Sequence, residues 1–279
     1  MQVILAKYAG ACYGVNRSLE LVDEAVDGES RVATLGALIH NPVVVDELNE
    51  KYGVRVLDDL HNVSDVDTIV IRSHGVTIDE QKQAEKFNVI DATCPHVKAV
   101  QQAAADLAKK YGQVIVVGKF GHPEVESVKS YIEAEDAKCY IWQNKDDIKA
   151  VSGKIGVVSQ TTQSQEVFNN LINYMKDEGF DLDVKNTICA ATQKRQDAAL
   201  ELARDVDAFV VIGGHNSSNT THLAGLVDSV CKATYHVETL DELKKQINQF
   251  SQYKKVGVTA GASTPVSQIE PIINFLENI

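Results

Sequence analysis

Three of the five cysteines in this chain of 279 residues share one sequence environment. Cys12, Cys94 and Cys189 each begin a segment whose apolar residues return at helical spacing, and a glycine follows each cysteine after 24 residues. Four residues beyond these glycines stand His40, His122 and Ser217. A shared phase of this kind predicts that the three thiols occupy equivalent places in an internal repeat, rather than filling a core one by one.

Three equivalent thiolates can meet near a common axis and hold a metal centre. Because the pattern offers no obvious fourth ligand, the centre would keep an open coordination position where a substrate can bind. Zinc accepts three cysteines and a water, and a [4Fe–4S] cluster held by three cysteines leaves one iron without a protein ligand. The spacing alone leaves both centres open. Cys139 and Cys231 instead border predicted strands and are interpreted as core residues.

Polar side chains that could bind an anion follow the expected strands. In open parallel sheets, ligands bind beyond the carboxyl ends of the strands, and helix N-termini nearby favour negative charge. These residue types together suit a multiply charged anion such as diphosphate. The candidates are His40, His74, His122, Thr161, Ser217, Ser218, Asn219 and Ser263. The remaining histidines are interpreted as structural residues: His61, His96, His215, His222 and His236.

The elements that must position these residues repeat three times. Each third of the chain reads as a helix, a short apolar strand ending in glycine, a second helix and two further strands. The glycine-ended strands are expected at 32–36, 114–118 and 209–213, and the last strand of each third at 69–75, 155–162 and 256–264. Short apolar strands alternating with helices predict parallel sheets.

We therefore expect an α/β fold of three similar lobes in a pseudo-threefold arrangement, each with a small parallel sheet. The lobes would span residues 1–93, 94–188 and 189–279. A metal centre would lie in the middle, where the three cysteines meet.

The charge balance excludes several classes of partner. The chain has 27 Lys and Arg against 39 Asp and Glu, a net charge of −12. A field of that sign repels nucleic acid and anionic membrane surfaces, so we expect no binding to either. No apolar run reaches the roughly 18 residues of a spanning helix, and the start of the chain lacks the features of a signal peptide, so we expect a cytoplasmic protein. Any phosphate site must therefore be built from specific local donors.

Eight ordered motifs resemble those of one enzyme family, the 4-hydroxy-3-methylbut-2-enyl diphosphate reductases (LytB), over essentially the whole chain. The motifs are Gly10-Ala11-Cys12-Tyr13-Gly14-Val15, His40-Asn41, Ser73-His74-Gly75-Val76, Asp91-Ala92-Thr93-Cys94-Pro95, Gly121-His122-Pro123-Glu124, Gln160-Thr161-Thr162, Cys189-Ala190-Ala191-Thr192 and Asn216-Ser217-Ser218-Asn219.

The resemblance implies a role for each of these residues. Cys12, Cys94 and Cys189 would hold a [4Fe–4S] cluster with one open iron site. Glu124, aided by Thr161 and by Thr192, would relay protons to the substrate hydroxyl. The diphosphate would be held by His40, His74, His122, Ser217, Ser218, Asn219 and Ser263.

The implied reaction is an oxidoreduction, the last step of the non-mevalonate isoprenoid pathway. Two electrons and protons would remove the allylic hydroxyl of (E)-4-hydroxy-3-methylbut-2-enyl diphosphate as water, giving isopentenyl and dimethylallyl diphosphates. Ferredoxin or flavodoxin would supply the electrons.

Two other classes fit part of the pattern. A phosphate-binding protein of three α/β lobes with core cysteines would be colourless and hold no iron. A zinc hydrolase with three cysteines and an activated water would contain zinc and be unaffected by oxygen. Iron and sulfide analysis after anaerobic purification separates all three classes.

Overall fold

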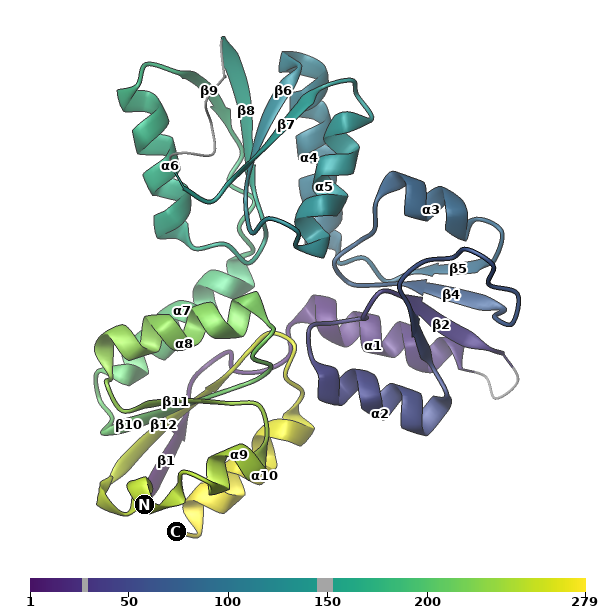
Figure 1. Cartoon of the computed structure of the whole chain (residues 1–279). Coiled ribbons are helices and arrows are strands. Elements are labelled where there is room, and N and C mark those ends of the chain that lie inside the picture. Colours follow the sequence, from purple (N-terminus) through teal and green to yellow (C-terminus); the bar gives the residue numbers. More distant parts are fainter. Residues whose placement is uncertain (27–29, 145–152) are drawn as a thin grey trace. The chain divides into compact units, whose positions relative to one another are not determined.

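The computed structural model describes residues 1–26, 30–144 and 153–279 (Figure 1). In this part of the chain the strands form three four-stranded parallel sheets, as the α/β prediction requires. Sheet I has the order β3 (Arg55–Leu57), β2 (Val32–Leu35), β4 (Thr68–Ile71), β5 (Asn88–Asp91). Sheet II has the order β7 (Lys138–Trp142), β6 (Gln113–Val117), β8 (Lys154–Ser159), β9 (Asp181–Val184). Sheet III has the order β11 (Thr234–Val237), β10 (Ala208–Ile212), β12 (Lys255–Ala260), β1 (Gln2–Leu5).

Helices connect the strands in all three sheets, as parallel pairing requires. The helices around sheet I are α1 (Tyr13–Ala25), α2 (Pro42–Tyr52) and α3 (Ile78–Ala84). Those around sheet II are α4 (Pro95–Tyr111), α5 (Pro123–Glu133) and α6 (Gln165–Asp177). Those around sheet III are α7 (Ala190–Ala203), α8 (Ser218–Val230), α9 (Leu240–Lys244), the 3₁₀ helix η2 (Ile247–Gln252) and α10 (Val266–Glu277). No described helix is long and apolar enough to cross a membrane.

The chain forms two compact units. Unit 1 comprises Met1–Asn16, His40–Val44 and Ala190–Ile279, and it contains sheet III. Unit 2 comprises Arg17–Ile39 and Val45–Cys189, and it contains sheets I and II.

The central strands carry the core because alternate residues bury on opposite faces. In sheet II, Val114 and Val116 pack with α4 and α5, whereas Ile115 and Val117 pack with α6. In sheet III the same alternation divides β10 between α7 and α8 on one face and α9 and α10 on the other. Both faces of each of these two sheets are therefore covered by helices.

Each sheet has a fourth strand that the sequence pattern does not predict. These strands are β5, β9 and β1, and each pairs with the strand predicted to end its third of the chain. They lie at sheet edges and are half-exposed, so they lack the continuous apolar run of a central strand.

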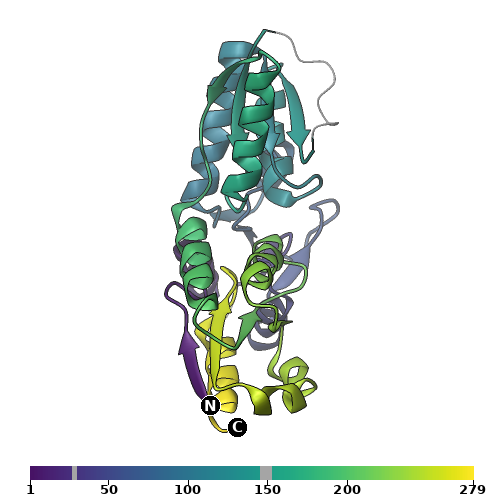
Figure 2. The same ribbon diagram turned by 90° about the vertical axis from the view of Figure 1, so that its left-hand side faces the viewer.

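The first strand of the chain belongs to the last sheet. β1 pairs with β12 in parallel, with Gln2 opposite Lys255 and Leu5 opposite Val258. Residues 2–5 therefore complete sheet III and take no part in the sheet of the predicted first lobe. The lobe boundaries after residues 93 and 188 stay a prediction. Both views show the two chain termini side by side in unit 1 (Figure 1, Figure 2).

Candidate active site

The three predicted ligand cysteines stand in equivalent turns. Each turn follows a fourth strand and leads into α1, α4 or α7. In each, the cysteine N–H donates to the carbonyl oxygen two residues beyond the end of a neighbouring strand. The bonds run from Cys12 to Ala262 (3.0 Å), from Cys94 to Ser73 (2.9 Å) and from Cys189 to Thr161 (2.8 Å). The carboxyl edge of each sheet thus fixes one cysteine backbone.

The thiols of these turns are set apart from the remaining two. Cys12, Cys94 and Cys189 are partly exposed, as is Cys139, and no disulfide forms among the described residues. Cys94 stands just before α4, whose first residue is a proline, and its thiol does not cap the helix. Cys231 is buried in the core between sheet III and its helices, and burial raises the pKa of Cys139 to about 12. A thiol with so high a pKa is a poor metal ligand.

Unit 1 brings together Cys12, His40, Ser217, Ser218, Asn219 and Ser263, all predicted site residues. The Ser263 hydroxyl donates to the His40 carbonyl oxygen (3.1 Å), and the Asn41 side-chain amide donates to the Ser263 carbonyl oxygen (2.8 Å). These bonds join the segment before α2 to the segment after β12. Ser263 directly follows Ala262, which accepts the Cys12 bond.

The N-terminus of α8 supplies the other polar groups of unit 1. Ser217 is the N-cap of the helix and accepts a bond from the Thr220 N–H. Asn219 is buried, and its Nδ2 has no hydrogen-bond partner among the described residues. An amide donor buried without a partner is rare, because its desolvation is uncompensated. A bound anion would supply the missing acceptor.

Unit 2 brings together His74, Cys94, His122, Glu124, Thr161 and Cys189. The rings of His74 and His122 meet edge to face with 5.6 Å between their centroids. His122 is the N-cap of α5, and its Nδ1 accepts the Glu124 N–H (3.2 Å). Because Nδ1 is an acceptor, neutral His122 carries its proton on Nε2, which makes Nε2 a donor.

Glu124 and Thr161 form a buried pair next to the Cys189 turn. The Thr161 N–H donates to Glu124 Oε1 (2.6 Å), and the Thr161 hydroxyl donates to Oε2 (2.8 Å). The Thr161 carbonyl oxygen in turn accepts the Cys189 N–H. Burial raises the pKa of Glu124 to about 7, although both Thr161 bonds lower it. A carboxyl group with this pKa can give or take a proton near neutral pH.

The histidines interpreted as structural include His236 in β11 and His215 in the turn after β10. His236 Nε2 lies 2.9 Å from the Gly213 carbonyl oxygen, and burial lowers the pKa of His236. His215 pairs with Glu242 at the surface (3.0 Å). Glu238 lies near this pair. Because His215 is exposed and Glu242 is partly exposed, we interpret the group as a surface ion pair.

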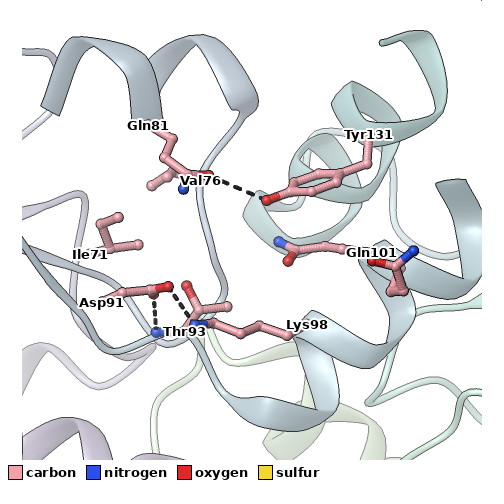
Figure 3. A pocket seen from close by; sticks show the side chains of 9 residues that line it. Ile71, Val76, Gln81, Asp91, Thr93, Lys98, Gln101 and Tyr131 are labelled. Atoms are coloured by element: carbon pink, nitrogen blue, oxygen red, sulfur yellow. Dashed lines mark hydrogen bonds and ion pairs between the residues drawn. The ribbon is translucent and has the colours of Figure 1, made fainter. Parts of the chain in front are cut away.

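A pocket of about 250 Å³ opens in unit 2 behind the Cys94 turn (Figure 3). Asp91 lies at its base, where its carboxylate accepts the Thr93 N–H (2.9 Å) and pairs with Lys98. On the opposite side Tyr131 donates to Gln81. None of the predicted ligand residues lines this pocket. Its lining instead includes Thr93, the residue that precedes Cys94.

Two arginines in contact with the cysteine turns were not predicted from the sequence. Arg195 of α7 donates to the Gly10 carbonyl oxygen (2.7 Å), and Arg17 of α1 lies 3.4 Å from the carbonyl oxygens of Asp91 and Thr93. Their signal in the sequence was their similar distance from a cysteine, since Arg17 comes five residues after Cys12 and Arg195 six after Cys189.

The comparisons with known proteins cover both units. The family model of the LytB protein matches residues 3–277. The chain belongs to the LytB family. One LytB relative, the 4-hydroxy-3-methylbut-2-enyl diphosphate reductase of Geobacter sp. (strain M21), is 44% identical over 100% of this chain and 98% of its own length. Another, the enzyme of that name from Trichlorobacter lovleyi, is 42% identical over 100% of this chain and 99% of its own length.

Solved structures of LytB relatives have the same fold. A structure of (E)-4-hydroxy-3-methylbut-2-enyl diphosphate reductase, described as the terminal enzyme of the non-mevalonate pathway, is 36% identical with a TM-score of 0.75, and the match covers 100% of both chains. The reductase from Plasmodium falciparum is 26% identical with a TM-score of 0.88 over 98% of this chain and 87% of that one. The resemblance and the fold class predicted from the sequence are therefore confirmed.

Proposed function

We propose that this LytB protein is a 4-hydroxy-3-methylbut-2-enyl diphosphate reductase, an oxidoreductase that acts last in the non-mevalonate isoprenoid pathway. It converts (E)-4-hydroxy-3-methylbut-2-enyl diphosphate, two electrons and two protons into isopentenyl or dimethylallyl diphosphate and water. In this reaction the allylic C–O bond breaks, one proton leaves with the oxygen as water and the other is added to carbon. The full-length family match carries the proposal, supported by the buried Glu124–Thr161 pair next to the Cys189 turn.

The cysteine turns suit an iron–sulfur cofactor. Cys12, Cys94 and Cys189 would hold a [4Fe–4S] cluster, because each has a fixed backbone and a partly exposed thiol at a sheet edge. When bound, the cluster supplies the two electrons one at a time and an iron site without a protein ligand. Three thiolates without a fourth ligand agree with that open site.

The diphosphate would be held by the polar residues predicted from the sequence. These are His40, His74, His122, Ser217, Ser218, Asn219 and Ser263. The His122 Nε2–H and the unpartnered Asn219 amide supply local donors. With a net charge of −12, the chain as a whole repels the substrate, so these donors must provide the attraction.

Glu124 is the proton donor of the reaction. Its pKa of about 7 keeps a large fraction protonated in neutral solution. A protonated Glu124 Oε2 can donate to Thr161 Oγ1, 2.8 Å away, and the threonine hydroxyl then passes its own proton towards the substrate oxygen. Thr192, buried in the first turn of α7, supports this relay.

The electrons come from outside the chain. We place the enzyme in the cytoplasm, with ferredoxin or flavodoxin as the donor. This assignment rests on the resemblance to the family.

Anaerobic cluster reconstitution tests the proposal. We expect brown protein with about four iron and four sulfide per chain that reduces the substrate to both products when given a reduced one-electron dye. A chain that stays colourless after reconstitution, or that binds zinc, would exclude the reductase.

The cysteine assignment has matched controls in the same chain. Cys12→Ser is expected to lose most of the cluster, whereas Cys139→Ser and Cys231→Ser keep it, as measured by iron and sulfide per chain. If a control variant lost the cluster while Cys12→Ser kept it, the ligand assignment would be wrong.

A further inference from the structure

Arg195 is a buried cation that contacts a cysteine turn. Its residue is 3% exposed within α7, and its Nη2 donates to the Gly10 carbonyl oxygen at 2.7 Å. Burying a guanidinium group costs free energy that only good hydrogen bonds or ion pairs recover. A smaller apolar residue would fill a helix face at lower cost. The buried arginine therefore indicates that the Gly10 carbonyl oxygen requires a strong hydrogen-bond donor.

Gly10 lies in the turn that precedes Cys12. Gly10 has a φ of +93°, and a Cβ at this residue would come within 2.9 Å of the Ile269 side chain. Its N–H donates to the Ala260 carbonyl oxygen (3.2 Å), and the Cys12 N–H donates to Ala262 (3.0 Å). These two bonds fix the donor side of the turn to the end of β12. Arg195 fixes the acceptor side, so the turn is held from both directions.

A second turn repeats the arrangement. The two terminal nitrogens of Arg17 each lie 3.4 Å from a backbone oxygen, one of Asp91 and one of Thr93, just before Cys94. Asp91 strengthens this turn by accepting the Thr93 N–H and by pairing with Lys98 (Figure 3).

The turn before Cys189 is held by a threonine side chain. The Thr187 hydroxyl donates to the Ser159 carbonyl oxygen (2.7 Å), and the Ser159 N–H donates to the Thr187 hydroxyl oxygen (2.8 Å). Each of the two arginines lies in a helix that follows one of the predicted ligand cysteines. The helix that follows Cys189 holds the turn before Cys12, and the helix that follows Cys12 holds the turn before Cys94.

We propose that Arg195 and Arg17 are positioning residues that orient the Cys12 and Cys94 thiolates for the cluster and supply positive charge beside them. This inference rests on the proposed function, because it assumes that these cysteines are cluster ligands. Groups around metal ligands set both how firmly a metal is held and its reduction potential. A cation near the thiolates favours the more reduced cluster, since reduction adds negative charge.

The test compares Arg195→Gln, which removes the charge, with Arg195→Lys, which keeps the charge but cannot reproduce the planar guanidinium. The same pair is made at Arg17. Arg31→Gln is the matched control, because Arg31 pairs with Asp67 at the surface and is 57% exposed. Two quantities are measured on anaerobic, reconstituted protein: the rate of iron release to a chelator and the midpoint potential of the cluster.

We expect Arg195→Gln to release iron at least tenfold faster than the unchanged protein and to have a more negative midpoint potential. Arg195→Lys should keep the potential but release iron at least threefold faster. Both Arg17 variants should follow the same order, and Arg31→Gln should match the unchanged protein in both measurements.

Each outcome decides the proposal. If Arg195→Gln binds a full cluster with unchanged release rate and potential, the positioning role is wrong. If that variant does not fold, Arg195→Lys decides, because an unchanged release rate in folded Arg195→Lys also rejects the role. An unchanged protein that takes up no cluster at all would instead reject the proposed function.

Discussion

Two opposing effects set the pKa of Glu124. Complete burial favours the neutral acid, whereas two hydrogen bonds from Thr161 favour the carboxylate. Burial is the larger effect, and it places the pKa at about 7. The sequence motif Gly-His-Pro-Glu directed attention to this residue, but only the fold brings it against Thr161, 37 residues along the chain.

Glu124→Gln is expected to lower turnover by about 10² or more, since the amide cannot donate a carboxylic proton. Iron and sulfide content should stay unchanged. In the unchanged enzyme, turnover should fall as the pH rises through about 7, where Glu124 loses its proton. Turnover numbers measured from pH 5.5 to 9 check both statements. Glu126→Gln, two residues along the same helix at a half-exposed site, is the control and should keep both turnover and its pH profile.

The same pKa makes the folded protein sensitive to pH. The folded-state pKa of Glu124 lies above its ordinary value of 4.5, so on raising the pH the unfolded chain loses this proton first. Glu124 therefore contributes full stability below pH 4.5, and this contribution is lost as the pH rises to about 7. A shift of this size corresponds to roughly 3 kcal/mol.

The Glu124→Gln variant has no carboxyl group to titrate at this position. The difference in free energy of unfolding, variant minus unchanged protein, should therefore become more positive as the pH rises from 4.5 to about 7. Urea unfolding of both proteins in the same cluster state measures the difference at each pH. A difference that does not vary with pH would mean that the pKa of Glu124 is the same in the folded and the unfolded protein.

At the scale of elements, the sequence was informative where strands are buried on both sides. The central strands β2, β6 and β10 are continuous apolar runs and lie within one residue of the expected bounds. The central strands β4, β8 and β12 begin within one residue of the expected start but end three or four residues earlier than expected, because the small polar residues that follow leave the sheet. Three edge strands, β1, β5 and β9, were missed because they are short and partly exposed, whereas the edge strands β3, β7 and β11 were expected. In β9, for example, aspartates alternate with Leu182 and Val184, which leaves too short an apolar signal for a strand.

Close approach of a helix to a strand sets another local requirement. A Cβ at Gly156 in β8 would come within 2.6 Å of Leu107 Cβ in α4. Gly156→Ala is therefore expected to destabilise the fold by about 1–3 kcal/mol through overpacking. Gly225 in α8 is exposed and would meet nothing within 4 Å, so Gly225→Ala should stabilise by about 0.5–1 kcal/mol through helix propensity. Thermal unfolding should give a lower Tm for Gly156→Ala and a higher Tm for Gly225→Ala than for the unchanged protein. Equal changes in Tm would contradict the packing argument.

At the scale of the whole molecule, each cysteine turn connects the last strand of one sheet to the first helix around the next. β5 precedes Cys94 and β9 precedes Cys189, while β1, which completes sheet III, precedes Cys12. The repeat of glycines and cysteines was visible in the sequence. The exchange of the first strand into the last sheet was not, because pairing between residues 253 apart leaves no local pattern.

A circular permutant tests this connectivity. Joining Ile279 to Met1 with a short Gly/Ser linker and opening the chain before Phe180 gives a chain that begins with β9 and Cys189, just as the natural chain begins with β1 and Cys12. Because the new ends lie in an exposed turn, we expect it to fold and to bind the same amount of iron. A permutant opened inside β8, a buried central strand, is the control and should not fold. Folding of both permutants is measured by circular dichroism. If neither permutant folds, the placement of β1 in sheet III would be contradicted.

The pairing of β1 with β12 also has a consequence for biosynthesis. A ribosome makes the first cysteine turn about 250 residues before the carbonyl groups that fix it, at Ala260 and Ala262. The Gly10–Cys12 turn therefore cannot take its final form on an unfinished chain. A polypeptide that stops short of β12 lacks this anchor for Cys12, so we expect such a chain to be unable to hold the proposed cluster.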